Sequence, residues 1–309
     1  MKSPSIVALR GNLEKVILGK PQAVEHLLIA LIAGGHILME DVPGVGKTTL
    51  ARALSLSLSG CFSRIQFTPD LLPADVLGVT IYNSHEQDFE FKKGPVFANV
   101  LLADEINRAS PRTQSALLQA MSESQATVDG VTHELEAPFM VIATQNPVEF
   151  HGTYPLPEAQ LDRFMLQTSL GYPSPEVEVQ VLFDQSRSHP LESLESVADG
   201  ETVVQLQNEA AEVKVEESVA RYMVSLVEAT RGHPSISIGA SPRGSLALFR
   251  ASRARALMHD RDYVLPDDVK TLAQPVLSHR LVLDVKARYS GVRAQDVVQE
   301  IVGETAVPS

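Results

Sequence analysis

A glycine-rich stretch that ends in a lysine and a threonine is the first place where this sequence could carry out chemistry. It reads Asp41-Val42-Pro43-Gly44-Val45-Gly46-Lys47-Thr48 and leads into a helical run from Thr49 to Leu58. Gly44 and Gly46 permit backbone conformations that expose consecutive N–H groups, and the N-terminal end of the following helix attracts phosphate oxygens. Lys47 can reach the β- and γ-phosphates of a nucleotide, and the Thr48 hydroxyl can ligate Mg²⁺. The stretch therefore predicts a phosphate-binding loop (P-loop) of the kind found in nucleoside-triphosphate hydrolases.

One residue of the predicted P-loop departs from the usual pattern. Asp41 stands where the full pattern has glycine, at the position that is least involved in holding phosphate. The alternative interpretation is a glycine-rich turn with an incidental Lys-Thr pair. The residues of this stretch that we expect to contact the nucleotide are Pro43, Gly44, Val45, Gly46, Lys47, Thr48 and Thr49.

Two acidic residues follow an apolar run in the segment Asn99-Val100-Leu101-Leu102-Ala103-Asp104-Glu105. A buried strand that ends in two acids is the Walker B pattern. Asp104 would hold Mg²⁺, directly or through water, and Glu105 would polarise an attacking water. Acids also end strands as solvated turns, so the interpretation gains its weight from the P-loop upstream.

A third buried run ends in polar side chains at Ile142-Ala143-Thr144-Gln145-Asn146-Pro147. Ligands bind at the carboxyl ends of parallel strands, so the end of this run is expected at the same edge of the sheet as the P-loop. Asn146 could orient the attacking water or contact the γ-phosphate. The alternative is an ordinary turn asparagine before proline.

Short apolar runs alternate with helical stretches through the first half of the chain. Runs without polar alternation are typical of a parallel sheet that is buried on both faces, and strands that alternate with helices indicate an α/β fold. The candidate strands are residues 37–39, 65–67, 100–103, 140–143 and 164–166.

The second half of the chain has a different pattern. Prolines 173 and 175 and the polar, acidic stretch from Leu191 to Glu201 are typical of a linker region. Apolar residues at helical spacing dominate after that stretch. We therefore predict an αβα nucleotide-binding domain over residues 1–190, with hairpin insertions, and a smaller all-helical domain over residues 191–309.

Composition restricts the class of partner. The chain has 309 residues and a formal net charge of −12, which opposes non-specific attraction to nucleic acids and anionic membranes. We expect no nucleic-acid partner and no membrane insertion, because the chain contains neither a signal peptide nor an apolar run of membrane-spanning length. The single cysteine, Cys61, suits a reducing compartment, and we expect a cytoplasmic location.

Taken together, these motifs resemble those of AAA+ ATPases and, among them, of the MoxR family, over most of the chain. Asp41 in place of glycine is common in that family. The stretches that carry the resemblance are Glu40 to Thr48, Asp104-Glu105-Ile106-Asn107-Arg108-Ala109, Pro111 to Leu118, Ala143 to Pro147 and Pro157-Glu158-Ala159-Gln160-Leu161-Asp162-Arg163-Phe164. The resemblance implies a P-loop AAA+ core with a parallel five-stranded sheet between helices and an all-α C-terminal lid domain.

The resemblance also implies roles for residues that spacing alone does not assign. Asn146 is similar to the sensor 1 residue. Arg163 resembles the arginine finger that reaches a neighbouring subunit's nucleotide, with Arg108 and Arg112 as further candidates. Arg243, in Gly239-Ala240-Ser241-Pro242-Arg243-Gly244, resembles sensor 2 on the lid. Leu18 and Gly19 lie in a segment, Val16 to Lys20, that is similar to the one flanking the adenine. The alternative for each arginine is a surface salt bridge, which is typically weak.

Two further segments resemble insertions of the clade that MoxR proteins share with magnesium chelatase ATPases. One pairs Val79–Tyr82 with Phe89–Phe91, and the other pairs Ala126–Val128 with Thr132–Leu135 around Asp129-Gly130, a dipeptide that favours tight hairpin turns. In this clade such hairpins face the ring pore or partners. The alternative is a pair of ordinary surface hairpins.

The resemblance implies an ATP hydrolase that uses ATP and Mg²⁺, with Lys47, Glu105, Asn146, Arg163 and Arg243 in the catalytic machinery. It implies a homo-oligomer, a hexamer as in the family, that acts as a chaperone-like remodelling ring on a protein client. The usual partners in the family are von Willebrand factor A domain proteins. Two alternatives remain open, namely an ATPase subunit of a magnesium-chelatase-like complex and a nucleotide-switched adaptor with little turnover.

Overall fold

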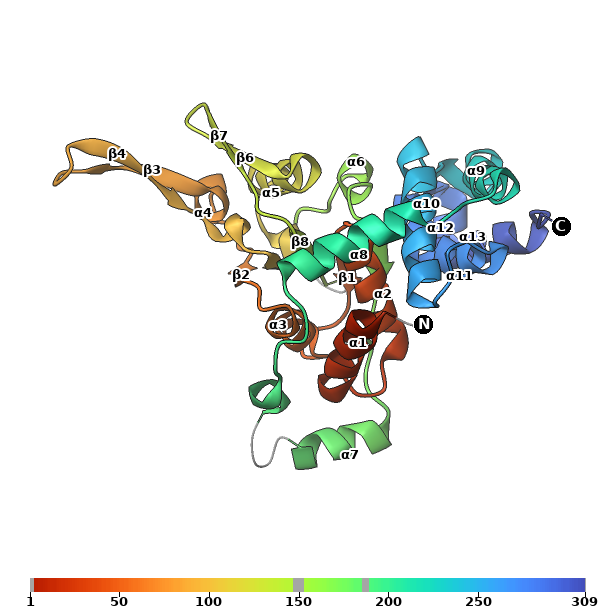
Figure 1. Ribbon diagram of the computed structural model, residues 1–309. Helices are drawn as coiled ribbons and strands as arrows, with labels where there is room; N and C mark the ends of the chain where they lie inside the picture. Colours follow the sequence, from red (N-terminus) through yellow and green to blue (C-terminus); the bar gives the residue numbers. More distant parts are fainter. Residues whose placement is uncertain (1–2, 147–152, 185–188, 309) are drawn as a thin grey trace.

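The architecture centres on a five-stranded parallel sheet (Figure 1). The computed structural model describes residues 3–146, 153–184 and 189–308, so Pro147 of the third motif lies outside the described residues. The strand order is β2-β5-β8-β1-β9. The bounds of these strands are β1 Ile37–Glu40, β2 Phe62–Gln66, β5 Val100–Asp104, β8 Met140–Gln145 and β9 Leu166–Thr168.

The three inner strands match the predicted runs closely, whereas the two edge strands are displaced. β2 begins three residues before the predicted start, and β9 begins at Leu166, where the predicted run ends. An edge strand has one neighbour and tolerates polar side chains such as Arg64 and Gln167, so its apolar pattern is weaker. The predicted parallel sheet is confirmed.

Alternate residues of the inner strands supply two separate apolar cores. Val100 and Leu102 of β5 belong to one core, and Leu101 and Ala103 belong to the other. Since successive side chains of a strand point to opposite faces, both faces of the sheet are buried. The helices of this part are α1 Pro4–Val16, α2 Pro21–Ile32, α3 Lys47–Ser57, α4 Pro73–Leu77, α5 Pro111–Glu123 and α6 Glu158–Leu161, with short 3₁₀ turns η1 Pro95–Phe97 and η2 Ile106–Arg108.

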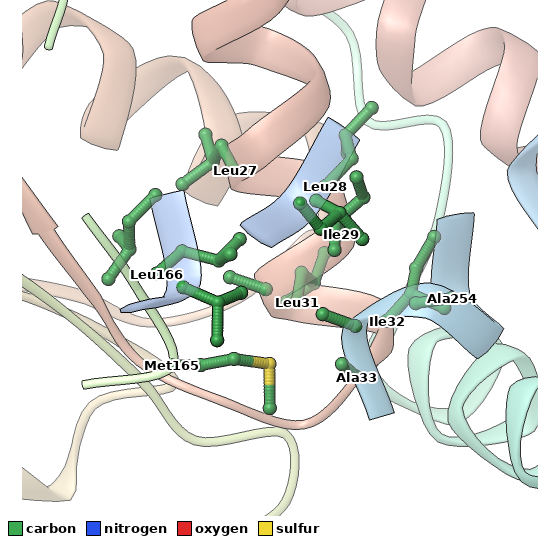
Figure 2. Close-up of a cluster of buried hydrophobic side chains, with 14 of the residues drawn as sticks. Leu27, Leu28, Ile29, Leu31, Ile32, Ala33, Met165, Leu166 and Ala254 are labelled. Atoms are coloured by element: carbon green, nitrogen blue, oxygen red, sulfur yellow. The ribbon is translucent and has the colours of Figure 1, made fainter. Parts of the chain in front are cut away.

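The second half of helix α2, from Leu27 to Ile32, is apolar and buried on all sides and joins the sheet to the C-terminal helices. Figure 2 shows its leucines and isoleucines between Met165 and Leu166 on one side and Ala254 on the other. Such a helix must be covered all round. Helix α2 therefore lies at the centre of the larger core.

Both predicted hairpins are present and extend away from the sheet (Figure 1). One pairs β3 (Gly78–Asn83) with β4 (Asp88–Lys93), and the other pairs β6 (Gln125–Val128) with β7 (Val131–Glu134). Phe91 stacks on the ring of His133 with centroids 4.0 Å apart, so the two hairpins touch near their bases.

The C-terminal part is helical apart from one short antiparallel strand pair, β10 (Ile236–Ile238) with β11 (Val282–Leu283). Its helices are α8 Gly200–Glu212, α9 Glu217–Gly232, α10 Pro242–Met258, α11 Pro266–Leu277, η4 Ser278–Arg280, α12 Val285–Tyr289 and α13 Ala294–Glu304. This part forms the lid, which contacts α2; α9 to α13 lie on the right of Figure 1, and α8 crosses the middle of the view.

The segment that was expected to be a linker contains regular structure. Pro175 opens helix α7 (Pro175–Asp184), and η3 (Pro190–Ser193) follows. Proline is tolerated at the first turn of a helix, where its missing N–H group has no intrahelical partner. The division at residues 190 and 191 stays a prediction. None of the helices described here is long and apolar enough to cross a membrane.

Candidate active site

The predicted P-loop follows β1 at the carboxyl edge of the sheet and ends where α3 begins at Lys47. Gly44 and Gly46 have φ angles of +85° and +102°, which L side chains rarely adopt. A Cβ atom at Gly44 would meet nothing within 4 Å, so the space before the loop is open to a ligand. The Lys47 ammonium donates to the carbonyl oxygens of Asp41, at 2.8 Å, and Val42, at 3.4 Å. The loop thus has two left-handed glycines, and its lysine lies back on the loop's own carbonyl oxygens.

Asp41 has a structural role that accounts for its departure from the glycine pattern. Its buried carboxylate accepts hydrogen bonds from the backbone N–H groups of Leu170 and, at 3.0 Å, of Gly171. These two residues follow β9, the neighbour of β1. The carboxylate thus ties the start of the P-loop to the segment after β9.

The two acids lie where β5 ends. The Asp104 carboxylate accepts hydrogen bonds from the Thr144 hydroxyl at 2.6 Å and from Arg64 at 2.7 Å. Glu105 has a left-handed φ of +56°, and its N–H group donates to the Thr144 oxygen at 2.9 Å. Thr144 on β8 therefore positions both acids, a role that the sequence pattern did not reveal although the residue lies in the third motif.

Two residues of β2 contact the acids and were not predicted. Arg64 contacts Asp104, and the Gln66 amide donates to Glu105 at 2.8 Å. Arg108 forms an ion pair with the same Glu105 oxygen at 2.9 Å. The sequence does show two polar side chains, Arg64 and Gln66, two residues apart on a candidate strand. Their contact with the acids requires β2 to lie beside β5, and strand order cannot be derived from the sequence pattern. In this structure Glu105 is therefore held by two donors.

The loop and the acids line one cavity of about 360 Å³. It brings together the predicted phosphate and metal residues from two strand ends and the first turn of α3. The lining residues are Pro43, Gly44, Gly46, Lys47, Thr48, Thr49, Arg64, Gln66, Asp104 and Glu105. Val45, also predicted to contact nucleotide, packs partly against the larger core.

The predicted base-flanking segment lies next to the P-loop. A Cβ atom placed on Gly46 would lie 4.0 Å from the Ile17 side chain. Leu18 follows, and Gly19 has a φ of +69°, with a Cβ position 3.1 Å from Val177 of α7. Residues 17–19 are thus near the phosphate cavity, where a nucleotide base could be reached.

Asn146 is buried and follows β8, whose neighbours are β5 and β1. It therefore lies at the same edge as Asp104 and the P-loop, although it is not among the residues lining the cavity.

Arg163 and Arg243 lie at the opposite edge of the sheet from the P-loop. They line a second cavity of about 250 Å³ with Gly34, Gly35 and His36, which precede β1. The Nε atom of Arg163 is buried and has no hydrogen-bond partner in the described part of the chain. The structure therefore brings the two arginines together but does not bring them to the P-loop of the same chain.

A shared contact joins the segments that carry the two arginines. The Asp162 carboxylate, next to Arg163, accepts hydrogen bonds from the Ser241 hydroxyl at 2.7 Å and from Arg280 at 2.8 Å. Ser241 caps α10 and accepts from the Arg243 N–H group at 3.1 Å. Burial lowers the pKa of Arg280 to about 10, so its guanidinium remains charged at neutral pH. Asp162 thus fixes the start of α10 relative to the Arg163 segment.

His36 supports this edge of the sheet from inside. Its Nδ1 accepts from the Val141 N–H group at 3.0 Å, and its Nε2 lies 3.0 Å from the Met121 carbonyl oxygen. Burial lowers the pKa of His36 to about 4, so the ring is neutral at pH 7 and donates through Nε2.

Comparisons with known proteins agree with this geometry. Residues 36–166 match the family model described as ATPase family associated with various cellular activities (AAA), and residues 228–301 match an AAA lid domain. The chain is 52% identical to the protein YeaC of Bacillus subtilis, over 96% of this chain and 93% of that one. It is 41% identical to chaperone MoxR1 of Mycobacterium tuberculosis, over 96% and 81%. A crystal structure from Cytophaga hutchinsonii superposes with a TM-score of 0.91 at 40% identity, covering 99% of this chain and 95% of that one.

Proposed function

Because this chain belongs to the MoxR family of AAA+ ATPases, we propose that it hydrolyses ATP in a ring of identical subunits and uses the energy to remodel a protein client. The observation that carries the proposal is the division of the site. The phosphate cradle and the acids share one cavity, whereas Arg163 and Arg243 line another at the opposite edge of the sheet.

The residues of the first cavity divide the work of binding and hydrolysis. The glycine loop and Lys47 would hold the β- and γ-phosphates, with Leu18 and Gly19 beside the base. Glu105 would accept a hydrogen bond from the attacking water and orient it, helped by Asn146. Thr48 and Asp104 supply the hydroxyl and carboxylate oxygens that Mg²⁺ prefers, and a bound Mg²⁺ would neutralise charge on the phosphates.

The second cavity supports a ring. Two arginines that face away from their own P-loop can act on a nucleotide only in another subunit, so both Arg163 and Arg243 would act in trans. An interface that joins two different edges is heterologous, and heterologous interfaces generate closed rings when the rotation closes. The proposed number of subunits is six, as in the family.

The proposed client is a protein, and a von Willebrand factor A domain protein is the first to test. The name of the mycobacterial relative, chaperone MoxR1, supports a remodelling role. A cytoplasmic location is part of the same proposal, because a chain with one exposed cysteine suits a reducing compartment.

The proposal is tested by measuring ATP hydrolysis per subunit over a dilution series. The rate per subunit is expected to fall as the ring dissociates, because each isolated subunit lacks the arginines of its neighbour. A rate per subunit that stays constant down to the monomer would contradict the ring.

A second assay separates an ATPase from a nucleotide-switched adaptor. The Glu105→Gln variant is expected to bind ATP and to stop hydrolysing it, which traps ATP-bound rings. Captured proteins from such rings would identify the client. Undiminished hydrolysis in this variant would remove Glu105 from the catalytic role.

A further inference from the structure

Helix α7 is a regular helix that buries none of its residues. It spans ten residues, and Figure 1 shows it set apart from the rest of the chain at the bottom of the view. Val179 is 52% exposed and Leu182 is 69% exposed. Most helical stability in proteins comes from packing an amphipathic face. Helix α7 therefore presents an apolar face that other elements of its own chain do not bury.

We propose that the outer face of α7 docks on the arginine stripe of α10 in a second copy of this chain. The outer face consists of Glu176, Glu178, Val179 and Leu182. The arginine stripe consists of Arg243, Leu246, Arg250 and Arg253, which recur at intervals of three or four residues and so share one side of α10. The inference rests on the proposed function, because it needs the subunits to meet head to tail.

The two surfaces have complementary charge. Helix α7 contains three acidic residues, Glu176, Glu178 and Asp184, and no basic residue. Helix α10 contains four arginines and no acidic residue. The chain as a whole has a formal net charge of −12, so this basic stripe differs in sign from the overall charge of the chain. The basic stripe therefore attracts an acidic helix. The same acidic helix is repelled by the acidic surface elsewhere on the chain.

The shapes of the two surfaces are also compatible. Leu246 is 62% exposed in the middle of the stripe. Arg250 borders two cavities, one of about 250 Å³ that also holds Arg163 and one of about 150 Å³. The smaller cavity is lined by Ile32, Ala33, Ala210 and Ala211 on its apolar side and by Gln207, Arg250 and Arg253 on its polar side. A leucine from α7 could enter such a hollow and lose its contact with water.

The positions of the surfaces require two copies. Val177 of α7 contacts Gly19, beside the P-loop at the carboxyl edge of the sheet. The stripe begins at Arg243, at the opposite edge. The same head-to-tail contact that carries Arg243 to a neighbour's nucleotide would carry the rest of the stripe toward the helix that touches Gly19. One interface would therefore complete the site and cover α7.

Cross-linking through introduced cysteines tests the contact directly. The parent variant carries Cys61→Ser, which removes the sole cysteine, and Glu105→Gln, which holds the ATP-bound ring. Leu182→Cys and Leu246→Cys are added singly and together, and each protein is treated with a short bis-maleimide in ATP. The pair is expected to give a ladder of covalent oligomers, because each chain then carries both halves of the contact. Each single variant is expected to lack the ladder. An assembled double variant without a ladder would overturn the docking.

A charge variant gives an independent readout. Leu182→Asp is expected to raise the protein concentration needed for assembly by about tenfold, since it places a carboxylate in an apolar contact. ATP binding by the diluted subunit is expected to stay unchanged, which shows that the chain is folded. The matched control is Val285→Asp on α12, where valine is 65% exposed outside both surfaces.

The outcomes separate this inference from the proposed function. Normal assembly of Leu182→Asp, with a wild-type protein that forms rings, would overturn the α7 contact alone. A wild-type protein that stays monomeric in ATP would overturn the contact and the ring together.

Discussion

The carboxyl edge of the sheet and its amino edge differ in the chemistry that they expose. The carboxyl edge has the glycine loop, two hydroxyls and two acids around one cavity. The amino edge has two arginines beside a different cavity. The first group suits binding and activation of water, and the second suits the stabilisation of charge that develops on a transferred phosphoryl group. Under the proposed function, neither edge alone holds all the residues of the hydrolysis site.

The two edges are also held in place by different means. Asp41 fixes the P-loop through two backbone N–H groups, and Thr144 fixes both acids. At the amino edge, Asp162 joins the Arg163 segment to the lid, and His36 bridges Val141 and Met121. Changes at each edge should therefore affect different steps, and four substitutions test this.

The largest expected effect is at the carboxyl edge. Lys47→Ala should abolish nucleotide binding and hydrolysis, because the variant lacks the ammonium that reaches the phosphates. Titration with a fluorescent ATP analogue measures the binding. Lys92→Ala on β4, away from the cavity, is the matched control and should bind normally. Retained binding in Lys47→Ala would contradict the cradle.

The next effect is at the amino edge. Arg163→Ala should lower kcat by roughly 10³ to 10⁵, the range known for arginine fingers, which is about 4–7 kcal/mol of barrier. Nucleotide affinity of the diluted subunit should not change, because Arg163 does not line the P-loop cavity. Arg112→Ala, at the exposed start of α5, should have little effect. The opposite pattern would reassign the finger to Arg112.

A smaller effect concerns stability at the amino edge as the pH falls. The pKa of His36 is lowered by burial from 6.5 to about 4, so the unfolded chain binds a proton between these values and the folded chain does not. The free energy of unfolding should therefore decrease as the pH is lowered from 6.5 to about 4, by about 3 kcal/mol for this group. The stability difference between wild type and His36→Asn, measured by urea unfolding from pH 7 to 4, should carry this dependence.

An exposed histidine gives the control for this experiment. His85, in the turn of the β3–β4 hairpin, is exposed, and His85→Gln should leave the pH dependence unchanged. Burial also lowers the pKa values of His26 and His279, so the wild-type protein should lose stability to acid beyond the His36 contribution. A His36→Asn curve parallel to that of the wild type would contradict the assignment.

The smallest effect is at the carboxyl edge again. Asp41→Gly restores the usual loop pattern but removes the acceptor for Leu170 and Gly171, which should cost roughly 1–3 kcal/mol of stability. Asp41→Asn keeps an acceptor oxygen and should lose less. Urea unfolding measures both. A glycine variant as stable as the wild type would show that the tie is dispensable.

The sequence predicted the inner sheet, and the structure brings most of the predicted carboxyl-edge residues into one cavity, because strands and contiguous motifs depend on local pattern. Runs such as Val100 to Ala103 are apolar on both faces, and the P-loop is a contiguous motif. It did not predict Arg64 and Gln66, because their contacts depend on strand order. Pro175 was interpreted as part of a linker, because a proline at the first turn of a helix and a proline in a linker cannot be distinguished from the local sequence.

The positions of the two arginines at the amino edge could not be predicted from the sequence either. The resemblance to AAA+ proteins implied that Arg163 and Arg243 belong to the site, but residue spacing could not place them on the far side of the sheet from Lys47. That placement follows from β9 and the lid packing against α2 and from the Asp162 contacts across 79 and 118 residues of sequence. Long-range packing of this kind is not visible in a local pattern.

Mixing two inactive variants tests the divided site most directly. Lys47→Ala keeps the arginines and lacks the cradle, whereas Arg163→Ala keeps the cradle and lacks the finger. In an equimolar mixed ring, about a quarter of the head-to-tail interfaces would join an intact cradle to an intact finger. Hydrolysis by the mixture is expected to rise well above that of either variant alone. A mixture no more active than the sum of its two components would contradict the central claim that the site is shared between subunits.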